Sequence, residues 1–323
     1  MSSIDRRHFI GAVAAAGAGL AATAGRPLPL AAQGDGRPRV YRIRRDDAVD
    51  NADNINYATV STMVDRSVQA LTGGSGSFAE CWKKLFAPDD VVTIKINCLF
   101  GPGACTHREV VTAVVSGLVS AGVSEDKITI WDRAPGDLVK CGYELNTGKG
   151  VKCLATGWEA QPTKSGSLNG PLATLLTDPQ VTALINVPVL KTHSTSGITL
   201  AHKNHYGSIK NPGDHHGNNC DPYLTDLNAL PCIKDKTRLI IADALRPVGD
   251  GGPAANPGAT WSYGAILAAT DPVALDAVGV RIIDEWRATK GLASIKPQAH
   301  FLQTSEKAGL GVADLSKIDL IDL

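Results

Sequence analysis

The residues with the clearest capacity for chemistry lie between positions 191 and 216. Five of the eight histidines fall in this stretch. Neutral imidazoles bind zinc, copper, iron and nickel, and they also act as general acids or bases near neutral pH. Three lysines stand beside these histidines, and nearby ammonium groups disfavour a divalent cation but favour a carboxylate or phosphate. The residues are Lys191, His193, His202, Lys203, His205, Lys210, His215 and His216.

One interpretation of this segment is a metal site. His202 and His205 are three residues apart, so both lie on one face of a helical turn and both can reach one ion. His193 is the third expected imidazole ligand, and Asp243 and Asp271 are the expected carboxylate ligands. The simplest role of Asp271 is nevertheless to cap the helix that begins at Pro272.

A second interpretation is an anion-binding or acid–base site. It uses Lys191 as the anion-binding or polarising group, His193 as the acid or base, and Lys203 with Asn204 to orient a substrate. A third interpretation is a surface loop whose histidines form only hydrogen bonds. His215 and His216 lie among glycine and asparagine, and they fit this third interpretation best.

The elements around this segment predict an α/β fold. Short apolar runs rich in β-branched residues predict strands, and helical patterns alternate with them. We therefore expect a mostly parallel sheet with helices on both faces, together with an irregular insertion over residues 136–180. The expected strands are 91–96, 128–131, 183–187, 239–242, 265–269 and 318–321, and the expected helices are 59–71, 106–121, 272–287 and 298–308.

Polar residues follow several of these strands, and ligands of such sheets bind at the carboxyl ends of the strands. We expect Asn97, Asp132, Lys191, Asp243 and Asp271 to meet at this edge, with Asn97 in the catalytic set and Asp132 in the ligand-binding set. Each of them alone is more simply explained as a cap or a turn residue.

Two further features contribute expected ligand contacts. Lys95 stands near the end of its strand. Gly251 and Gly252 lie in a glycine-rich loop, and glycine lets backbone N–H groups approach a ligand closely. The stretch from Asp271 to Asp276 begins a helix, and of its two aspartates only Asp271 is an expected ligand.

These stretches, in this order, resemble a family known only as domain of unknown function 362. The matching elements are Ile94-Lys95-Ile96-Asn97, Pro188-Val189-Leu190-Lys191-Thr192-His193, Lys203-Asn204 with Gly207, Asp243 with Gly251-Gly252-Pro253, and Asp271-Pro272 through Asp276. The resemblance covers about residues 91–314. It implies one site for the polar residues but no reaction. Many members resemble iron–sulfur proteins with a ferredoxin-type cysteine run, and this chain lacks that run.

The N-terminus predicts export. Arg6-Arg7 precede Phe9-Ile10, an uncharged Ala/Gly-rich stretch follows, and Ala22-Thr23-Ala24 provides a small-residue cleavage site. This pattern is typical of a twin-arginine signal peptide, and the apolar stretch is too short to span a bilayer. We expect residues 1–24 to be the signal and residues 25–323 to form a single α/β domain outside the cytoplasm, in the periplasm or extracellular space. The twin-arginine translocase is the expected partner during export.

Charge and cysteine content limit the function further. The net charge is zero, which gives no electrostatic basis for binding nucleic acid or an anionic membrane. The seven cysteines include no C-x-x-C pair, so up to three disulfides are expected after export, with Cys141–Cys153 and Cys220–Cys232 the pairs that close the shortest irregular loops.

The functional hypothesis is an exported enzyme with a Lys/His/Asp site at the strand ends, acting on a small or anionic ligand. No cofactor is identified, although twin-arginine export is typical of proteins that fold around one, which favours a metal or redox cofactor. One alternative is a periplasmic binding protein for a small anion or a metal, without turnover. Another is an accessory partner of a redox complex.

Overall fold

A computed structural model describes residues 36–323 of the chain; the predicted signal peptide lies outside these residues. Its strands are β1 (Arg39–Arg44), β2 (Val92–Lys95), β3 (Ile128–Asp132), β4 (Lys152–Ala155), β5 (Thr163–Ser165), β6 (Leu168–Gly170), β7 (Ala183–Asn186), β8 (Val189–His193), β9 (Gly197–Thr199), β10 (Thr237–Val248), β11 (Ala265–Ala269) and β12 (Asp319–Asp322).

The α-helices of the described residues are α1 (Tyr57–Leu71), α2 (Phe78–Leu85), α3 (Arg108–Ser120), α4 (Pro135–Lys140), α5 (Thr174–Thr177), α6 (Ala201–Asn204), α7 (Tyr223–Asn228), α8 (Pro231–Lys234), α9 (Pro272–Thr289) and α10 (Phe301–Lys307). None of the helices within residues 36–323 combines the length and the apolar character that a membrane crossing requires.

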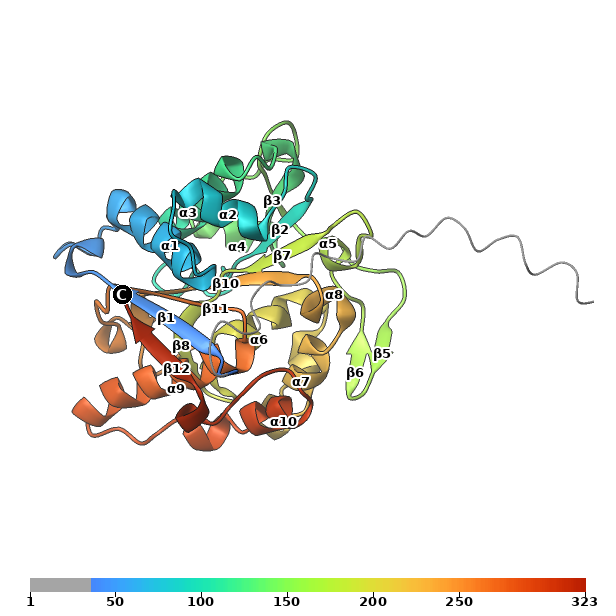
Figure 1. The fold of residues 1–323 in the computed structure, drawn as a ribbon. Coiled ribbons are helices and arrows are strands. Elements are labelled where there is room, and N and C mark those ends of the chain that lie inside the picture. The colour runs from blue at the N-terminus through green and yellow to red at the C-terminus, as the bar shows by residue number, and fades with distance from the viewer. Residues whose placement is uncertain (1–35) are drawn as a thin grey trace, which may run out of the picture.

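One large sheet divides the molecule into two layers (Figure 1). The strand order is β12-β1-β11-β10-β7-β2-β3-β4, and β8 pairs with β10 and β9. The five strands from β10 to β4 are parallel, which confirms the mostly parallel α/β prediction. β11 is antiparallel to both of its neighbours, β10 and β1.

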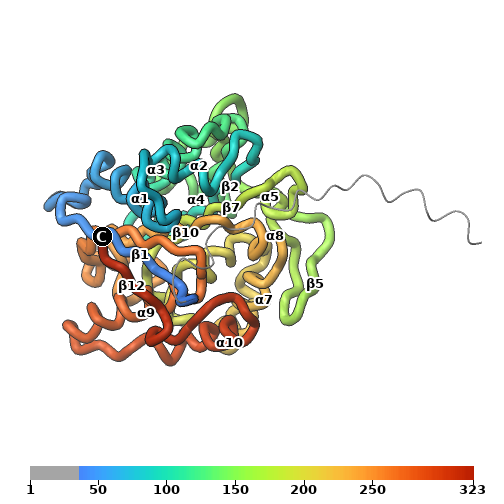
Figure 2. The backbone as a smooth tube through the Cα atoms, viewed as in Figure 1, coloured from blue at the N-terminus to red at the C-terminus, as the bar shows by residue number. Residues whose placement is uncertain are grey.

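Helices cover both faces of the sheet. Helices α1, α2 and α3 lie on one face, and α6, α7, α9 and α10 lie on the other, as the backbone trace also shows (Figure 2). Successive residues of β10 alternate between the two apolar cores: Ile240 and Ala242 face one, and Leu239 and Ile241 face the other. This double burial explains why the strand is a continuous apolar run in the sequence.

Several predicted elements are confirmed with small changes at their ends. The helix expected over 59–71 begins at Tyr57, and α9 begins at Pro272 with Asp271 as its cap, accepting from the Ala274 amide at 2.8 Å. Thr106 is not the first residue of the helix that was expected over 106–121. Helix α3 begins after His107, and the Thr106 hydroxyl instead binds the Asn97 amide and the Val187 carbonyl.

Three other predictions need correction. The expected strands begin at residue 91, but β1 comes earlier and pairs with β11 and β12 inside the sheet. The region 136–180 is not wholly irregular, because β4 extends the main sheet and β5 pairs with β6. Strand β10 does not end at Asp243 but continues to Val248, so that Asp243 lies within the strand.

Candidate functional site

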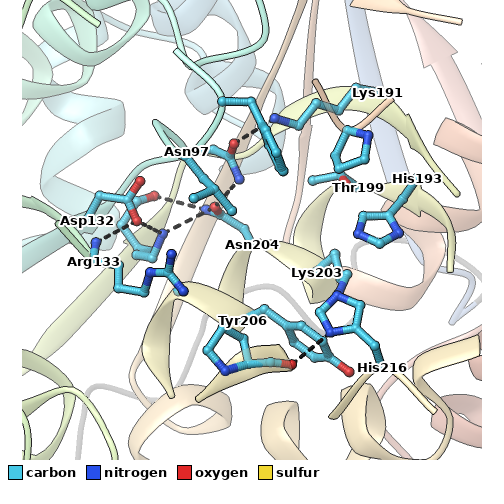
Figure 3. A pocket seen from close by; sticks show the side chains of 16 residues that line it. Asn97, Asp132, Arg133, Lys191, His193, Thr199, Lys203, Asn204, Tyr206 and His216 are labelled. Carbon is cyan, nitrogen blue, oxygen red and sulfur yellow. Dashed lines mark hydrogen bonds and ion pairs between the residues drawn. The ribbon is translucent and has the colours of Figure 1, made fainter. Parts of the chain in front are cut away.

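A cavity of about 260 Å³ opens where β2, β3 and β8 end, at the carboxyl edge of the parallel strands (Figure 3). Three lysines and one arginine line it, together with a single carboxylate. Its lining is Lys95, Asn97, Leu99, Phe100, Asp132, Arg133, Lys191, His193, Thr199, Lys203, Asn204, Tyr206, Gly207, Pro212, His216 and Pro253. The structure therefore brings Asn97, Asp132 and Lys191 together, although Lys191 lies within β8 rather than after a strand. Four other expected site residues line the same cavity: Lys95, His193, Lys203 and Asn204.

One wall of the cavity is a buried ion pair. The Lys95 ammonium donates to Asp132 Oδ1 at 2.9 Å, and both side chains are almost fully buried. The backbone amides of Cys98 and Arg133 also donate to this carboxylate, at 2.6 and 2.8 Å. Among the described residues that line the cavity, Asp132 is the only carboxylate, and it already pairs with Lys95.

Gly207 is required beside this pair. A Cβ atom at position 207 would lie 2.9 Å from Lys95 Nζ and 3.0 Å from Asp132 Oδ1. Both distances are shorter than ordinary van der Waals contact, so any larger residue would displace the ion pair. This is a physical reason for a glycine after the Lys203-Asn204 motif.

Two asparagines connect this wall to a second lysine. Asn204 Oδ1 accepts from Lys95 Nζ at 3.3 Å and from Asn97 Nδ2 at 3.1 Å. Asn97 Oδ1 in turn accepts from Lys191 Nζ at 2.8 Å (Figure 3). The other partner of Lys191 is the Ala104 carbonyl at 2.5 Å. Both partners of Lys191 are neutral, and burial lowers the pKa of Lys191 to about 8.

A third lysine stands on the other side of the cavity. Lys203 Nζ lies 2.9 Å from His216 Nε2 and 3.3 Å from the centre of the Tyr206 ring. His216 Nδ1 lies 2.8 Å from the Pro212 carbonyl, so Nδ1 carries the proton and Nε2 accepts from Lys203. Burial lowers the pKa of Lys203 to about 7, and the neighbouring Cys220 thiol opposes this shift only in part.

His193 presents an N–H group to the cavity. The backbone amides of Thr195 and Ser196 both donate to its Nδ1, at 3.1 and 3.3 Å, so the proton of the neutral ring is on Nε2. Burial and the nearby lysines lower the pKa of His193 to about 3. A neutral ring with this tautomer is a hydrogen-bond donor rather than a base, because its lone pair is occupied.

The segment that carries Lys203 and Asn204 is held by a distant carboxylate. Asp276 of α9 is fully buried and accepts from the amides of Ala201 and His202, at 2.6 and 3.1 Å, and from His202 Nδ1 at 2.9 Å. It therefore occupies the free amides at the start of α6. Asp276 therefore holds α6 in place, and it is not part of the cavity lining.

The glycine-rich loop also positions the site. The Gly252 amide donates to Thr192 Oγ1 at 3.0 Å, and a Cβ atom at Gly252 would collide with the Thr192 carbonyl. Gly251 adopts a φ of +71°, and the following Pro253 reaches the cavity wall. Gly251 and Gly252 thus bring the loop against β8, while the cavity lining includes neither of them.

The residues expected to bind a metal are not brought together. His202 packs against Phe301, and His205 Nδ1 lies 3.2 Å from Ser208 Oγ, with burial lowering the pKa of His205 to about 3. Within residues 36–323, no group of three or more His, Cys, Asp or Glu side chains is placed to hold an ion. Metal binding stays a prediction.

The strand-end argument fails for two aspartates. Asp243 lies within β10 and binds the backbone amide and the ring of His107, both at 2.7 Å. Asp271 follows β11, and because β11 runs antiparallel to β10, its end lies at the opposite edge of the sheet. There Asp271 caps α9 and accepts from the Val312 amide at 3.0 Å.

Several lining residues were not predicted. Arg133, Thr199 and Tyr206 carried no distinctive spacing, although Arg133 directly follows the predicted strand-end residue Asp132. His216 was assigned to an incidental loop but contacts Lys203, and the η4 turn (Pro212–His215) places it there. Its neighbour His215 points away from the cavity, toward Tyr223.

The disulfide predictions are wrong for this structure. All seven cysteines lie in the described part of the chain, and all are free thiols. The Cys141 thiol lies 3.4 Å from the Cys98 carbonyl instead of bonding to Cys153, which is buried in β4. The hydrogen bond with Cys105 lowers the pKa of Cys141, but the hydrogen bond with Cys98 and burial outweigh it and raise this pKa to about 12.

The fold and the site define an α/β protein with a lysine-rich cavity at the carboxyl edge of a mostly parallel sheet. The chain belongs to the family described as domain of unknown function (DUF362), whose model matches residues 92–281. This match confirms the resemblance, although it ends before residue 314. No curated protein matches the chain.

A solved structural-genomics protein from Thermotoga maritima is similar over 77% of this chain, with 10% identity and a TM-score of 0.40. The chain spans 60% of the length of that protein. At this level of similarity the likeness carries no information about function.

Lys203→Met is expected to stabilise the protein at neutral pH. Burial places the pKa of Lys203 at about 7 in the folded chain, against 10.5 as the ordinary value. Between pH 7 and pH 10.5, Lys203 is protonated in the unfolded state but largely neutral in the folded state. The free energy of unfolding of the wild type therefore increases as pH rises through this range. The variant lacks this rise. It should therefore be the more stable protein at pH 7, by on the order of a few kcal/mol, with a smaller difference at pH 10.

Urea unfolding of both proteins at pH 7, 8.5 and 10 measures this difference. The control is Lys210→Met, which replaces an exposed lysine of the same segment and should show no such trend. A difference between Lys203→Met and the wild type that is constant over this range would contradict the lowered pKa of Lys203.

Proposed function

We propose that the chain is an enzyme that binds a small organic carboxylate at Lys191 and transfers a proton through Lys203. The observation that carries the proposal is the charge of the cavity: four basic side chains face one carboxylate, and Lys95 already pairs with that carboxylate. Lys191 and Lys203 have only neutral hydrogen-bond partners. A buried ammonium without a counterion is costly, and an anionic ligand offsets that cost.

The size and the donors of the cavity favour a carboxylate over a phosphate. Its volume of about 260 Å³ is below the ~300–1,000 Å³ typical of drug-sized ligands, which points to a small ligand. Phosphate sites commonly use the free amides of a helix N-terminus. In α6, the helix that carries Lys203, Asp276 already occupies these amides.

The proton-transfer role goes to Lys203 because its pKa, about 7, is the closest to neutral among the lysines of the cavity with a shifted pKa. A general base works best when its pKa is near the working pH. His193, the acid or base expected from the sequence, has its Nδ1 lone pair occupied and a pKa of about 3. We assign His193 to donating a hydrogen bond from Nε2 to the ligand, and Asn97 and Asn204 to holding the lysines in place.

Lys191→Met is expected to weaken butyrate binding by about 30-fold or more, because removing one partner of a buried charge pair costs about 2–5 kcal/mol. For the wild type, binding should weaken between pH 6.5 and 9. The pKa values of Lys191 and Lys203 are about 8 and about 7, so both ammonium groups lose their protons over this range. Isothermal titration calorimetry with butyrate and with inorganic phosphate measures both effects.

Lys210→Met is the control and should bind butyrate like the wild type. Equal butyrate affinity in Lys191→Met and the wild type would refute the assignment of Lys191. Tighter binding of inorganic phosphate than of butyrate would replace the carboxylate with a phosphate ligand.

Catalysis is distinguished from capture by hydrogen exchange. Carboxylates that bind are incubated with the protein in D₂O, and proton NMR follows loss of the hydrogen on the carbon next to the carboxylate. We expect exchange with the wild type and a rate at least 100-fold lower with Lys203→Met, the contribution typical of a general base. Binding without exchange for every ligand would identify a binding protein without turnover, the rival function.

We also propose that the chain acts outside the cytoplasm. The support is the Arg6-Arg7 pair with the apolar stretch and small-residue site that follow it. In a bacterium with a twin-arginine translocase, the full chain should reach the periplasm, and Arg6→Lys with Arg7→Lys should keep it in the cytoplasm. Cell fractionation and immunoblotting of the two proteins test this. Equal periplasmic amounts would reject the twin-arginine route.

A further inference from the structure

The mouth of the cavity carries apolar side chains that have no cover. Leu99 and Phe100 both line the cavity, and they are 40% and 45% exposed. They follow directly after Cys98, whose amide binds Asp132, so the ion pair fixes the base of their loop. A large apolar side chain at a cavity mouth is costly in water, and a ligand that covers it recovers that free energy.

Two prolines from other parts of the chain add to this apolar surface. Pro212 comes from the η4 turn that also positions His216, and Pro253 comes from the glycine-rich loop held against Thr192. Together with Leu99 and Phe100, they form an apolar rim contributed by three separate segments. We call these four residues the apolar rim.

The basic groups lie next to this rim. The Lys191 ammonium is 5.6 Å from the centre of the Phe100 ring. Lys191 itself is 1% exposed, whereas Phe100 is 45% exposed, so charge lies at the buried end of the cavity and apolar surface at its open end. A ligand that satisfies both ends has a charged head and an apolar tail.

The loop that carries Leu99 and Phe100 turns at two glycines. Gly101 and Gly103 adopt φ values of +73° and +81°, conformations that favour glycine. A Cβ atom at Gly101 would meet nothing within 4 Å, whereas one at Gly103 would lie 3.3 Å from Ala255 Cβ of the glycine-rich loop.

We propose that the ligand is an amphiphilic monocarboxylic acid, with its carboxylate at Lys191 and an alkyl or aryl tail against the apolar rim. This inference rests on the proposed function and narrows it from small carboxylates in general to those with an apolar tail. Lys203 lines the same cavity as Lys191, and the proposal places the carbon next to the carboxylate beside it.

Titration of the wild type with acetate, butyrate, hexanoate and phenylacetate at pH 6.5 tests the inference. Each added methylene should tighten binding by about fourfold, the factor that corresponds to burying one CH₂ group. Hexanoate should therefore bind more than tenfold tighter than butyrate. Succinate, which carries a second carboxylate in place of an apolar tail, should bind more weakly than butyrate.

Phe100→Ala should reduce the ratio of hexanoate affinity to acetate affinity by at least fivefold, and Leu99→Ala should reduce it in the same direction. Both side chains are exposed, so the variants are expected to fold. Val139→Ala is the control, because Val139 is a 55% exposed apolar residue outside the cavity lining. It should leave the ratio unchanged.

The outcomes separate this inference from the proposed function. Equal affinity for acetate, butyrate and hexanoate, or a preference for succinate, would refute the proposal of an apolar tail. It would not affect the proposal of a carboxylate site at Lys191. An unchanged ratio in both Phe100→Ala and Leu99→Ala would also overturn the role of the rim. Absence of binding for every carboxylate would overturn the proposed function, and the inference with it.

Discussion

The cost of burying ammonium groups without a carboxylate partner is the constraint on which this site depends. Lys191 is almost fully buried and Lys203 nearly so, and neither has a carboxylate among its hydrogen-bond partners. Neutral oxygens and an imidazole nitrogen surround them, which offsets only part of the lost hydration. The result is two amines that exchange protons near neutral pH and a cavity that gains free energy from an anion.

The neutral partners are held in place by a continuous set of hydrogen bonds. Asp132 binds Lys95, Lys95 binds Asn204, and Asn204 binds Asn97, which reaches Lys191. Asn204 also donates to Asn186 Oδ1 at 2.7 Å, at the end of β7. Since each amide uses both its donor and its acceptor, no member can rotate without breaking a bond elsewhere. The network therefore holds Lys95 and Lys191 apart and correctly directed before any ligand arrives.

The parts of the fold that the sequence predicts are those set by local pattern. Continuous apolar runs mark the buried strands, and Asp271-Pro272 marks the start of α9. Parallel strands place their carboxyl ends at one edge, which is why Asn97 and Asp132, at the ends of β2 and β3, meet as expected. The pattern does not give strand direction, however. Asp271 follows an antiparallel strand, so it lies at the other edge.

Other features depend on long-range pairing that local pattern does not encode. Lys191 lies on β8, which forms a hairpin with β9 and also pairs with the part of β10 that continues past Asp243. His216 reaches Lys203 across 13 residues of turns, and its neighbour His215 points elsewhere. Histidine spacing therefore indicated the correct segment but not which imidazoles face the cavity. Likewise, cysteine spacing could not show that Cys141 lies against Cys98 rather than Cys153.

The most direct test of the account is to observe the lysine amines themselves. Protein labelled with ¹³C at lysine Cε can be titrated by NMR, with Lys191→Met and Lys203→Met used to assign the two signals. The account predicts midpoints at about 8 for Lys191 and about 7 for Lys203, both moving upward when butyrate is added. Midpoints above 10 for both amines, unchanged by butyrate, would contradict it.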